Sequence, residues 1–177
     1  MSSRIIFIMG GARSGKSTYA LKDASTVSGN KAYIATAEAL DEEMRERIEK
    51  HKKQRGTDWD TYEEPLRIAE VIQETEGKYT AIVIDCLTLW LSNIMHSGFN
   101  ITQEITNLIE ILRVSHHTSR IYIVSNEVGM GIVPENDMAR GFRDIAGILN
   151  QKVAEVSDEV YLLVAGIPIH IKGKGEK

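Results

Sequence analysis

The chain has 177 residues, and 42% of them are hydrophobic, so it is long enough for one stable domain without disulfides or a structural metal. Its 21 lysines and arginines and 25 aspartates and glutamates give a net charge of −4, which argues against general attraction to nucleic acid or an anionic membrane. The single cysteine excludes an internal disulfide and a cysteine-based zinc cluster and is compatible with a cytoplasmic protein, and the apolar runs are too short to span a bilayer.

Short β-branched and apolar runs predict five strands, most of them separated by segments of helical pattern. In chain order the runs are Ile5–Met9, Ala32–Ala35, Ala81–Ile84, Ile121–Val124 and Val160–Val164. This alternation predicts an α/β fold with a mostly parallel sheet flanked by helices. Because no repeat, low-complexity tract or linker divides the chain, we expect one domain over residues 1–177.

The first predicted strand leads directly into a glycine-rich loop that opens a predicted helix. Gly10, four further residues and then Gly15-Lys16-Ser17 form the P-loop pattern in the setting that the pattern requires. Glycines let backbone N–H groups surround phosphates, and the helix N-terminus adds partial positive charge. We therefore expect a nucleoside triphosphate here, with Lys16 on the β- and γ-phosphates and Ser17 on Mg²⁺. The alternative is a glycine-rich turn followed by an incidental Lys-Ser.

The segment Leu40–Arg55 is predicted to be a helix that begins acidic and ends basic. Met44, Ile48 and His51 share one face at i, i+4 and i+7, and two interpretations of His51 stay open. In one, it is a half-buried end to the apolar face. In the other, neighbouring cations keep its imidazole neutral and nucleophilic near pH 7 and hold phosphates beside it. Attack on an α-phosphorus would then form a covalent N–P bond and release pyrophosphate.

Asp85 follows the buried run Ala81–Ile84 directly and is the candidate Walker B carboxylate for Mg²⁺. The alternative is that Asp85 caps a helix beginning near Leu87, since aspartate is a preferred N-cap residue. The two roles are compatible with each other.

Two amphipathic helices are predicted further along the chain. One begins at Asn100, where Asn100 and Gln103 are placed like a capping box, and the other lies within Asn136–Ser157. Both are expected to cover the sheet.

The last predicted element is a terminal hairpin. Its strands, Tyr161–Ala165 and Ile167–Ile171, are separated by Gly166. Pro168 indicates an edge strand, because proline has no N–H to donate to a neighbouring strand.

Four stretches together resemble one enzyme family. They are Gly10-Gly11-Ala12-Arg13-Ser14-Gly15-Lys16-Ser17, Tyr33-Ile34-Ala35-Thr36-Ala37, His51-Lys52 with Arg55 and Trp59, and Asn126-Glu127-Val128-Gly129-Met130-Gly131-Ile132-Val133-Pro134-Glu135. With the following Phe142–Gly147, they are similar to the bifunctional adenosylcobinamide kinase / adenosylcobinamide-phosphate guanylyltransferase of cobalamin biosynthesis, from about Ile5 to Lys172. The resemblance implies a P-loop NTPase domain similar to RecA and a homotrimer.

The resemblance implies two reactions. The aminopropanol hydroxyl of adenosylcobinamide is phosphorylated with ATP or GTP, and GMP is then transferred from GTP to that phosphate through a guanylylated His51, giving adenosylcobinamide-GDP and pyrophosphate. Residue by residue, the family pattern implies nucleotide contacts at Gly10, Gly11, Ala12, Arg13, Ser14, Gly15, Lys16, Ser17, Ala35, Thr36, Ala37, Lys52, Lys53, Gln54, Arg55, Glu63 and Asp85. Other members can have glutamate where Asp85 stands, which keeps the charge and changes its reach.

The loop Asn126–Glu135 follows a predicted strand, at the position where ligands bind in open α/β sheets. We assign this loop to substrate or subunit contacts, and the alternative is a glycine-rich connector. Two rival functions would use the same P-loop. One is a simple small-molecule kinase in which His51 is structural. The other is an NTP-driven motor or switch acting on nucleic acid or protein, which the acidic balance and the lack of a basic stripe disfavour.

Overall fold

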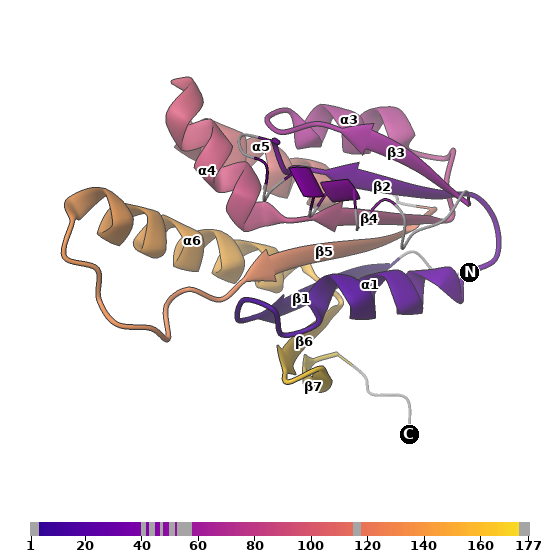
Figure 1. The fold of residues 1–177 in the computed structure, drawn as a ribbon. Coiled ribbons are helices and arrows are strands. Elements are labelled where there is room, and N and C mark those ends of the chain that lie inside the picture. Colours follow the sequence, from indigo (N-terminus) through magenta and orange to yellow (C-terminus); the bar gives the residue numbers. More distant parts are fainter. Residues whose placement is uncertain are drawn as a thin grey trace.

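The computed structural model describes residues 4–39, 42, 45, 46, 48, 49, 52, 58–114 and 118–173. These residues form a seven-stranded sheet in the order β3-β2-β4-β5-β1-β6-β7. The strands are β1 Arg4–Gly10, β2 Lys31–Ala35, β3 Trp59–Glu63, β4 Ala81–Asp85, β5 Arg120–Asn126, β6 Glu159–Val164 and β7 Ile167–Lys172. Neighbouring strands are parallel except for the β6–β7 hairpin, which is antiparallel (Figure 1).

Different helices cover the two faces of the sheet. The helices are α1 Lys16–Ser25, α3 Ile68–Thr75, α4 Leu87–Ser97, α5 Ile101–Val114 and α6 Asp137–Val156. Because successive side chains of a strand point to opposite faces, Ile5 and Phe7 of β1 pack in the cluster formed with α3 to α6, while Ile6 and Ile8 pack in the cluster formed with α1. The helix α1 thus lies on one side of the sheet and α6 on the other (Figure 1).

The five predicted strands and the α/β class are confirmed. The terminal hairpin is confirmed as well, with β7 at the edge and Pro168 opposite Leu163. The edge strand β3 was not predicted, because its sequence Trp-Asp-Thr-Tyr-Glu has no apolar run. It pairs with β2 alone, and of its five residues only Trp59 is buried, so burial leaves no periodic signal in the sequence.

The helices predicted from Asn100 and within Asn136–Ser157 are α5 and α6. The capping box at Asn100 is only half present. The Asn100 Oδ1 accepts from the Gln103 N–H at 3.1 Å, but the Gln103 amide donates to Asn107 Oδ1 at 2.8 Å and does not return to the cap. At α6, Asn136 Oδ1 accepts from the Ala139 N–H at 2.7 Å. Of the helices in the described part of the chain, none is long and apolar enough to cross a bilayer.

The parallel strands bring the predicted motifs to one edge of the sheet. Gly10 ends β1 opposite Asn126 at the end of β5, and Ala35 ends β2 opposite Asp85 at the end of β4. The candidate site is therefore built at the carboxyl ends of the strands, where open α/β sheets bind ligands.

Candidate active site

The P-loop joins β1 to α1 and has the backbone shape of a phosphate-binding turn. Gly15 is the N-cap of α1 with φ 95°, a left-handed conformation that glycine adopts without strain. The Lys16 side chain is only 6% exposed, and its Nζ donates to the Gly11 carbonyl at 2.6 Å. It also lies 3.5 Å from Ser14 Oγ. The ammonium group of this first residue of α1 is thus held across the loop.

Asp85 and Ser17 are placed on two different elements of this edge. Ser17 lies in the first turn of α1, and Asp85 ends β4, which β5 separates from β1. The Tyr33 hydroxyl donates to Asp85 Oδ2 at 2.8 Å. The N-cap of α4 is Cys86, which makes no side-chain capping bond, so the alternative in which Asp85 caps this helix is wrong.

Cys86, next to Asp85, has the properties of a structural thiol. Burial, with the charge of Asp85 adding to it, raises the pKa of the Cys86 thiol above its usual range. The Cys86 Sγ lies 3.2 Å from Thr88 Oγ1. A buried thiol of raised pKa is protonated at neutral pH, so it is a poor nucleophile and a poor metal ligand.

Thr36 joins the end of β2 to the end of β4. The Thr36 Oγ1 donates to the Cys86 carbonyl at 2.8 Å and accepts from the Cys86 N–H at 2.7 Å, and the Thr36 N–H donates to the Asp85 carbonyl. The Asn93 side chain donates to the Thr36 carbonyl. The side chain of Thr36 is fully buried, so its hydroxyl fixes the backbone of this edge in place.

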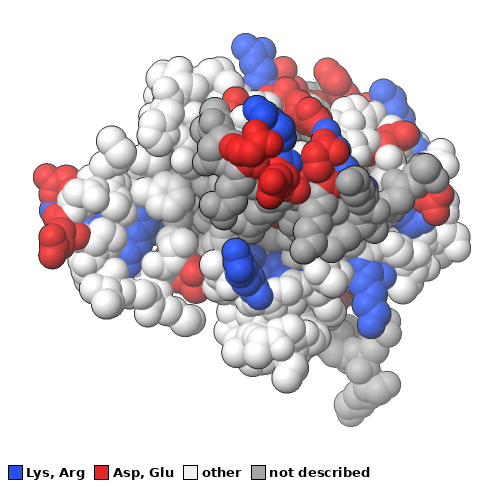
Figure 2. Space-filling view, in the orientation of Figure 1, with Lys and Arg blue, Asp and Glu red and all other residues white. Residues whose placement is uncertain are grey.

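Lys52 reaches the same edge from the segment that follows Ala37. Its Nζ lies 2.5 Å from Oε1 of Glu63, which ends β3 opposite Ala35, and 3.7 Å from Oε1 of Glu49. Both Lys52 and Glu63 are well exposed, so each ion pair contributes at most about 1 kcal/mol. Figure 2 shows acidic and basic side chains intermixed on the face of the molecule in view. One exposed ion pair in the same segment joins Arg45 to Glu42.

The structure describes only part of the predicted helix Leu40–Arg55. Residues 42, 45, 46, 48, 49 and 52 are helical. His51, Lys53, Gln54 and Arg55 lie outside the described residues.

The loop after β5 is held by hydrogen bonds within itself and from two arginines of α6. Glu127 Oε1 accepts from the Gly129 N–H at 2.5 Å, and Arg143 Nη2 donates to the Gly129 carbonyl at 2.7 Å. Arg140 donates to two further carbonyls, those of Pro134 and Glu135. Three apolar side chains of the loop are well exposed, Met130 at 81%, Ile132 at 96% and Val133 at 60%, and so is Met138 at 67% in the first turn of α6.

Asn150 supports this loop from α6 and was not singled out from the sequence. It accepts from Ser125 Oγ at 2.7 Å and donates to the Asn126 carbonyl at 3.2 Å. A polar residue on the buried stripe of α6, next to Leu149, was the signal that could have identified it. The Asn126 side chain donates in turn to Thr88 Oγ1 on α4.

Comparisons with known proteins converge on one family. The model of the family described as cobinamide kinase / cobinamide phosphate guanyltransferase matches residues 6–171. The chain is 40% identical to the bifunctional adenosylcobalamin biosynthesis protein CobP of Pseudomonas aeruginosa, over 94% of this chain and 96% of the relative. It is also 40% identical to the bifunctional adenosylcobalamin biosynthesis protein CobU of Salmonella typhimurium, over 95% of this chain and 99% of the relative.

Solved structures of lower sequence identity share the fold. The RadB recombinase matches with a TM-score of 0.53 and 13% identity, over 90% of this chain and 73% of the recombinase. An ATPase of a bacterial type III secretion system matches with a TM-score of 0.51 and 13% identity, over 90% of this chain and 50% of that one. The predicted RecA-like α/β fold is thereby confirmed.

Proposed function

The chain belongs to the cobinamide kinase / cobinamide phosphate guanyltransferase family, and we propose how its residues divide the two reactions of this bifunctional enzyme of adenosylcobalamin biosynthesis. In the first reaction, ATP or GTP phosphorylates the aminopropanol hydroxyl of adenosylcobinamide. In the second, GMP passes from GTP to that phosphate, giving adenosylcobinamide-GDP and pyrophosphate. One P-loop, within one domain, serves both reactions.

In the kinase reaction, the P-loop from Gly10 to Ser17 holds the triphosphate through its N–H groups. The observation that supports this best is the buried Lys16, whose ammonium lies across the loop at the N-terminus of α1. The substrate hydroxyl oxygen attacks the γ-phosphorus and gives up its proton to solvent, the bond from that phosphorus to the β–γ bridging oxygen breaks, and the nucleoside diphosphate leaves. Lys16 stabilises the charge that develops on the phosphate oxygens.

The donor set at this edge fits Mg²⁺. Ser17 offers a hydroxyl and Asp85 a half-buried carboxylate, and hard oxygen ligands are the ones that Mg²⁺ prefers. Among the described residues there is no cluster of three or more His, Cys, Asp or Glu side chains that would form an all-protein metal cage. We infer that Ser17 and Asp85 hold Mg²⁺ together with the phosphates, and that Tyr33 orients the Asp85 carboxylate. When bound, the ion neutralises phosphate charge.

In the second reaction, His51 is the proposed nucleophile. Its imidazole nitrogen attacks the α-phosphorus of GTP, an N–P bond forms, and the bond from that phosphorus to the α–β bridging oxygen breaks to release pyrophosphate. A phosphate oxygen of adenosylcobinamide phosphate then attacks the same phosphorus and breaks the N–P bond. Lys52, the next residue along the chain, reaches Glu63 at the nucleotide edge, which supports a role for this part of the chain at the site.

The nucleophile is tested by the mass of the protein after incubation with GTP and Mg²⁺. We expect an added GMP that is acid-labile, base-stable and absent from His51→Ala. The variant should keep kinase activity, because hydroxyl phosphorylation does not pass through the imidazole. A His51→Ala protein that still gains GMP would contradict the assignment. Equal loss of both activities in a folded variant would indicate a structural or shared role.

The remaining proposed contacts rest on the family resemblance. Ala35, Thr36, Ala37, Lys53, Gln54 and Arg55 are proposed to contact the nucleotide, with Thr36 doing so through the backbone that its hydroxyl fixes. The loop Asn126–Glu135 is proposed to meet the corrinoid substrate, and a neighbouring subunit is the other occupant to be tested. A homotrimer and a cytoplasmic location complete the proposal.

A further inference from the structure

The turn of the β6–β7 hairpin lies directly against the P-loop. The Gly166 N–H donates to the Ser14 carbonyl at 2.9 Å. Ala165 and Gly166, the two turn residues, have φ values of 52° and 81°, and two-residue hairpin turns of type I′ require positive φ at both positions. The contact therefore joins a tight turn at one edge of the sheet to the loop that follows its β1 strand.

The hairpin also leaves little room for a side chain at two positions of the P-loop. A Cβ on Gly10 would lie 2.5 Å from the Leu163 carbonyl oxygen of β6, which is too close for any side chain. A Cβ on Gly15 would lie 3.3 Å from the Gly166 Cα. The backbone of the hairpin thus occupies the space behind the P-loop, and the loop is confined from that side.

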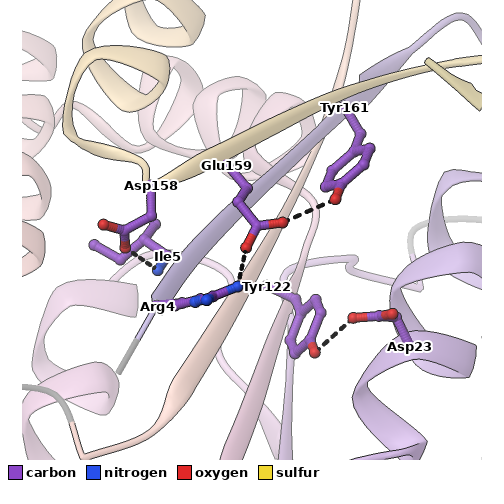
Figure 3. Close-up of polar contacts among 7 residues, drawn as sticks. All are labelled: Arg4, Ile5, Asp23, Tyr122, Asp158, Glu159 and Tyr161. Carbon is purple, nitrogen blue, oxygen red and sulfur yellow. Dashed lines mark hydrogen bonds and ion pairs between the residues drawn. The ribbon is translucent and has the colours of Figure 1, made fainter. Parts of the chain in front are cut away.

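The base of the hairpin is anchored to β1, as Figure 3 shows. Arg4 Nη1 lies 2.7 Å from Glu159 Oε1, and the Tyr161 hydroxyl donates to Glu159 Oε2 at 2.8 Å. The Ile5 N–H donates to Asp158 Oδ2 at 2.7 Å. A hairpin fixed at its base presents its turn at a defined position.

The hairpin also touches the helix behind the P-loop. The Tyr161 ring packs against the ring of Tyr19 on α1, with centroids 5.6 Å apart. The turn at Gly166 and the ring at Tyr161 therefore contact the loop and its helix at two separate points.

From these contacts we propose that Gly166 is a positioning residue for the triphosphate, an inference that rests on the proposed function of the P-loop. A trans peptide unit is rigid and planar, and its C=O and N–H point in opposite directions. By holding the Ser14 carbonyl on the outside of the loop, Gly166 directs the Gly15 N–H of the same peptide unit toward the inside. That N–H is among the donors that a P-loop offers to phosphate.

The experiment compares two glycines with the same backbone conformation. Gly166 has φ 81° and Gly77, in the turn between α3 and β4, has φ 74°, and a Cβ at either position meets nothing within 4 Å. Valine at either position keeps the N–H but strains the left-handed backbone. We expect Gly166→Val to weaken GTP binding about tenfold. It should weaken GMP binding much less, because the P-loop holds the outer phosphates.

The control and rescue variants decide the outcome. Gly77→Val should lose similar thermal stability and bind GTP as the unmodified protein does, and Gly166→Asn should largely restore binding, because asparagine tolerates positive φ. If Gly166→Val does not fold, Gly166→Ala takes its place in the same comparison. A Gly166 variant that loses stability but keeps its preference for GTP over GMP would overturn the inference. Unchanged GTP affinity in Lys16→Ala would instead overturn the P-loop assignment on which the inference rests.

Discussion

Two loops leave neighbouring strands at the same edge of the sheet and offer opposite chemistry. The P-loop follows β1 and presents backbone N–H groups and the buried Lys16 ammonium. The loop 127–136 follows β5, and its starting point is tied to the P-loop because the Glu127 N–H donates to the Gly10 carbonyl at 2.9 Å. In this second loop the Gly129 backbone bonds to the side chains of Glu127 and of Arg143 on α6, while Met130 and Ile132 are exposed.

The difference matches the two kinds of substrate that the enzyme has to bring together. A triphosphate is small and highly charged, so it is best bound by fixed N–H donors and one cation. A corrinoid is a large ring system with broad apolar faces, so it is best bound by exposed and adaptable apolar side chains such as methionine. We therefore expect substitutions in the two loops to affect different substrates.

The largest effect is expected from Lys16→Ala. Removing the buried ammonium should reduce kinase and guanylyltransferase turnover together by about 10²- to 10³-fold, because both reactions require the triphosphate to be held and neutralised. The measurement is the initial rate of each reaction at saturating adenosylcobinamide or its phosphate.

Lys22 provides the matched control for this prediction. It lies at the other end of α1 and is exposed, so Lys22→Ala removes the same charge without touching the loop. Both rates should stay within about twofold, since surface charges contribute little. Normal turnover by Lys16→Ala, or equal losses in the two variants, would show that the charge at the P-loop is not what drives catalysis.

The parts of this edge that were predicted from sequence are those whose determinants are local. The P-loop is one continuous run between a strand and a helix, and the strands are short apolar runs. The helix within Asn136–Ser157 was predicted from an apolar stripe that repeats along one segment. Each of these patterns is complete within one segment, so no knowledge of the tertiary structure was needed.

The parts that were missed depend on contacts between distant segments. Gly166 meets Ser14 only after β6 has paired with β1, and Asn150 meets Ser125 only after α6 has packed on the sheet. Thr36 was assigned to the site by family resemblance, but its bonds to Cys86 were missed because they require β2 and β4 to be neighbours. A periodic pattern reports which face of an element is buried, but not which residue lies opposite.

A smaller and more selective effect is expected from Ile132→Ser, at the most exposed apolar side chain of the second loop. If Ile132 is buried against the corrinoid, losing its apolar surface should raise the KM for adenosylcobinamide about tenfold. The dissociation constant for GTP should not change. The matched control is Ile148→Ser, the same substitution at an exposed isoleucine on α6. It should leave both constants unchanged.

The same variant separates the two proposed occupants of this loop. An unchanged KM combined with a shift of the Ile132→Ser protein to a smaller species in size-exclusion chromatography would assign the loop to subunit contacts. An unchanged KM without such a shift would favour a plain connector. It would contradict the proposal that the two loops bind different substrates.

The smallest effect on turnover is expected from Tyr122→Phe, which removes a contact between the strand before the second loop and the helix after the P-loop. Tyr122 of β5 is fully buried, and its hydroxyl donates to Asp23 of α1 at 2.8 Å, so the strand that leads into the second loop also holds the helix behind the P-loop (Figure 3). Tyr122→Phe removes this bond and should lower the free energy of unfolding by about 1 to 2 kcal/mol at pH 7, as measured by urea denaturation. The turnover of either reaction should change less than about twofold, because Lys16 keeps its place in the P-loop.

The pH dependence of the unfolding free energy tests whether the lost hydroxyl causes the lower stability of Tyr122→Phe. Burial, followed by the bond to Asp23 and its negative charge, raises the pKa of Tyr122 above its ordinary value of about 10. The unfolded chain therefore loses this proton at a lower pH than the folded protein does, and the stabilisation is fully present below about pH 10 and declines above it. The unfolding free energies of the two proteins should converge as the pH rises beyond about 10. If the difference between them stays constant there, the loss in Tyr122→Phe comes from altered packing, and the proposed bond between β5 and α1 is not the support that the two loops share.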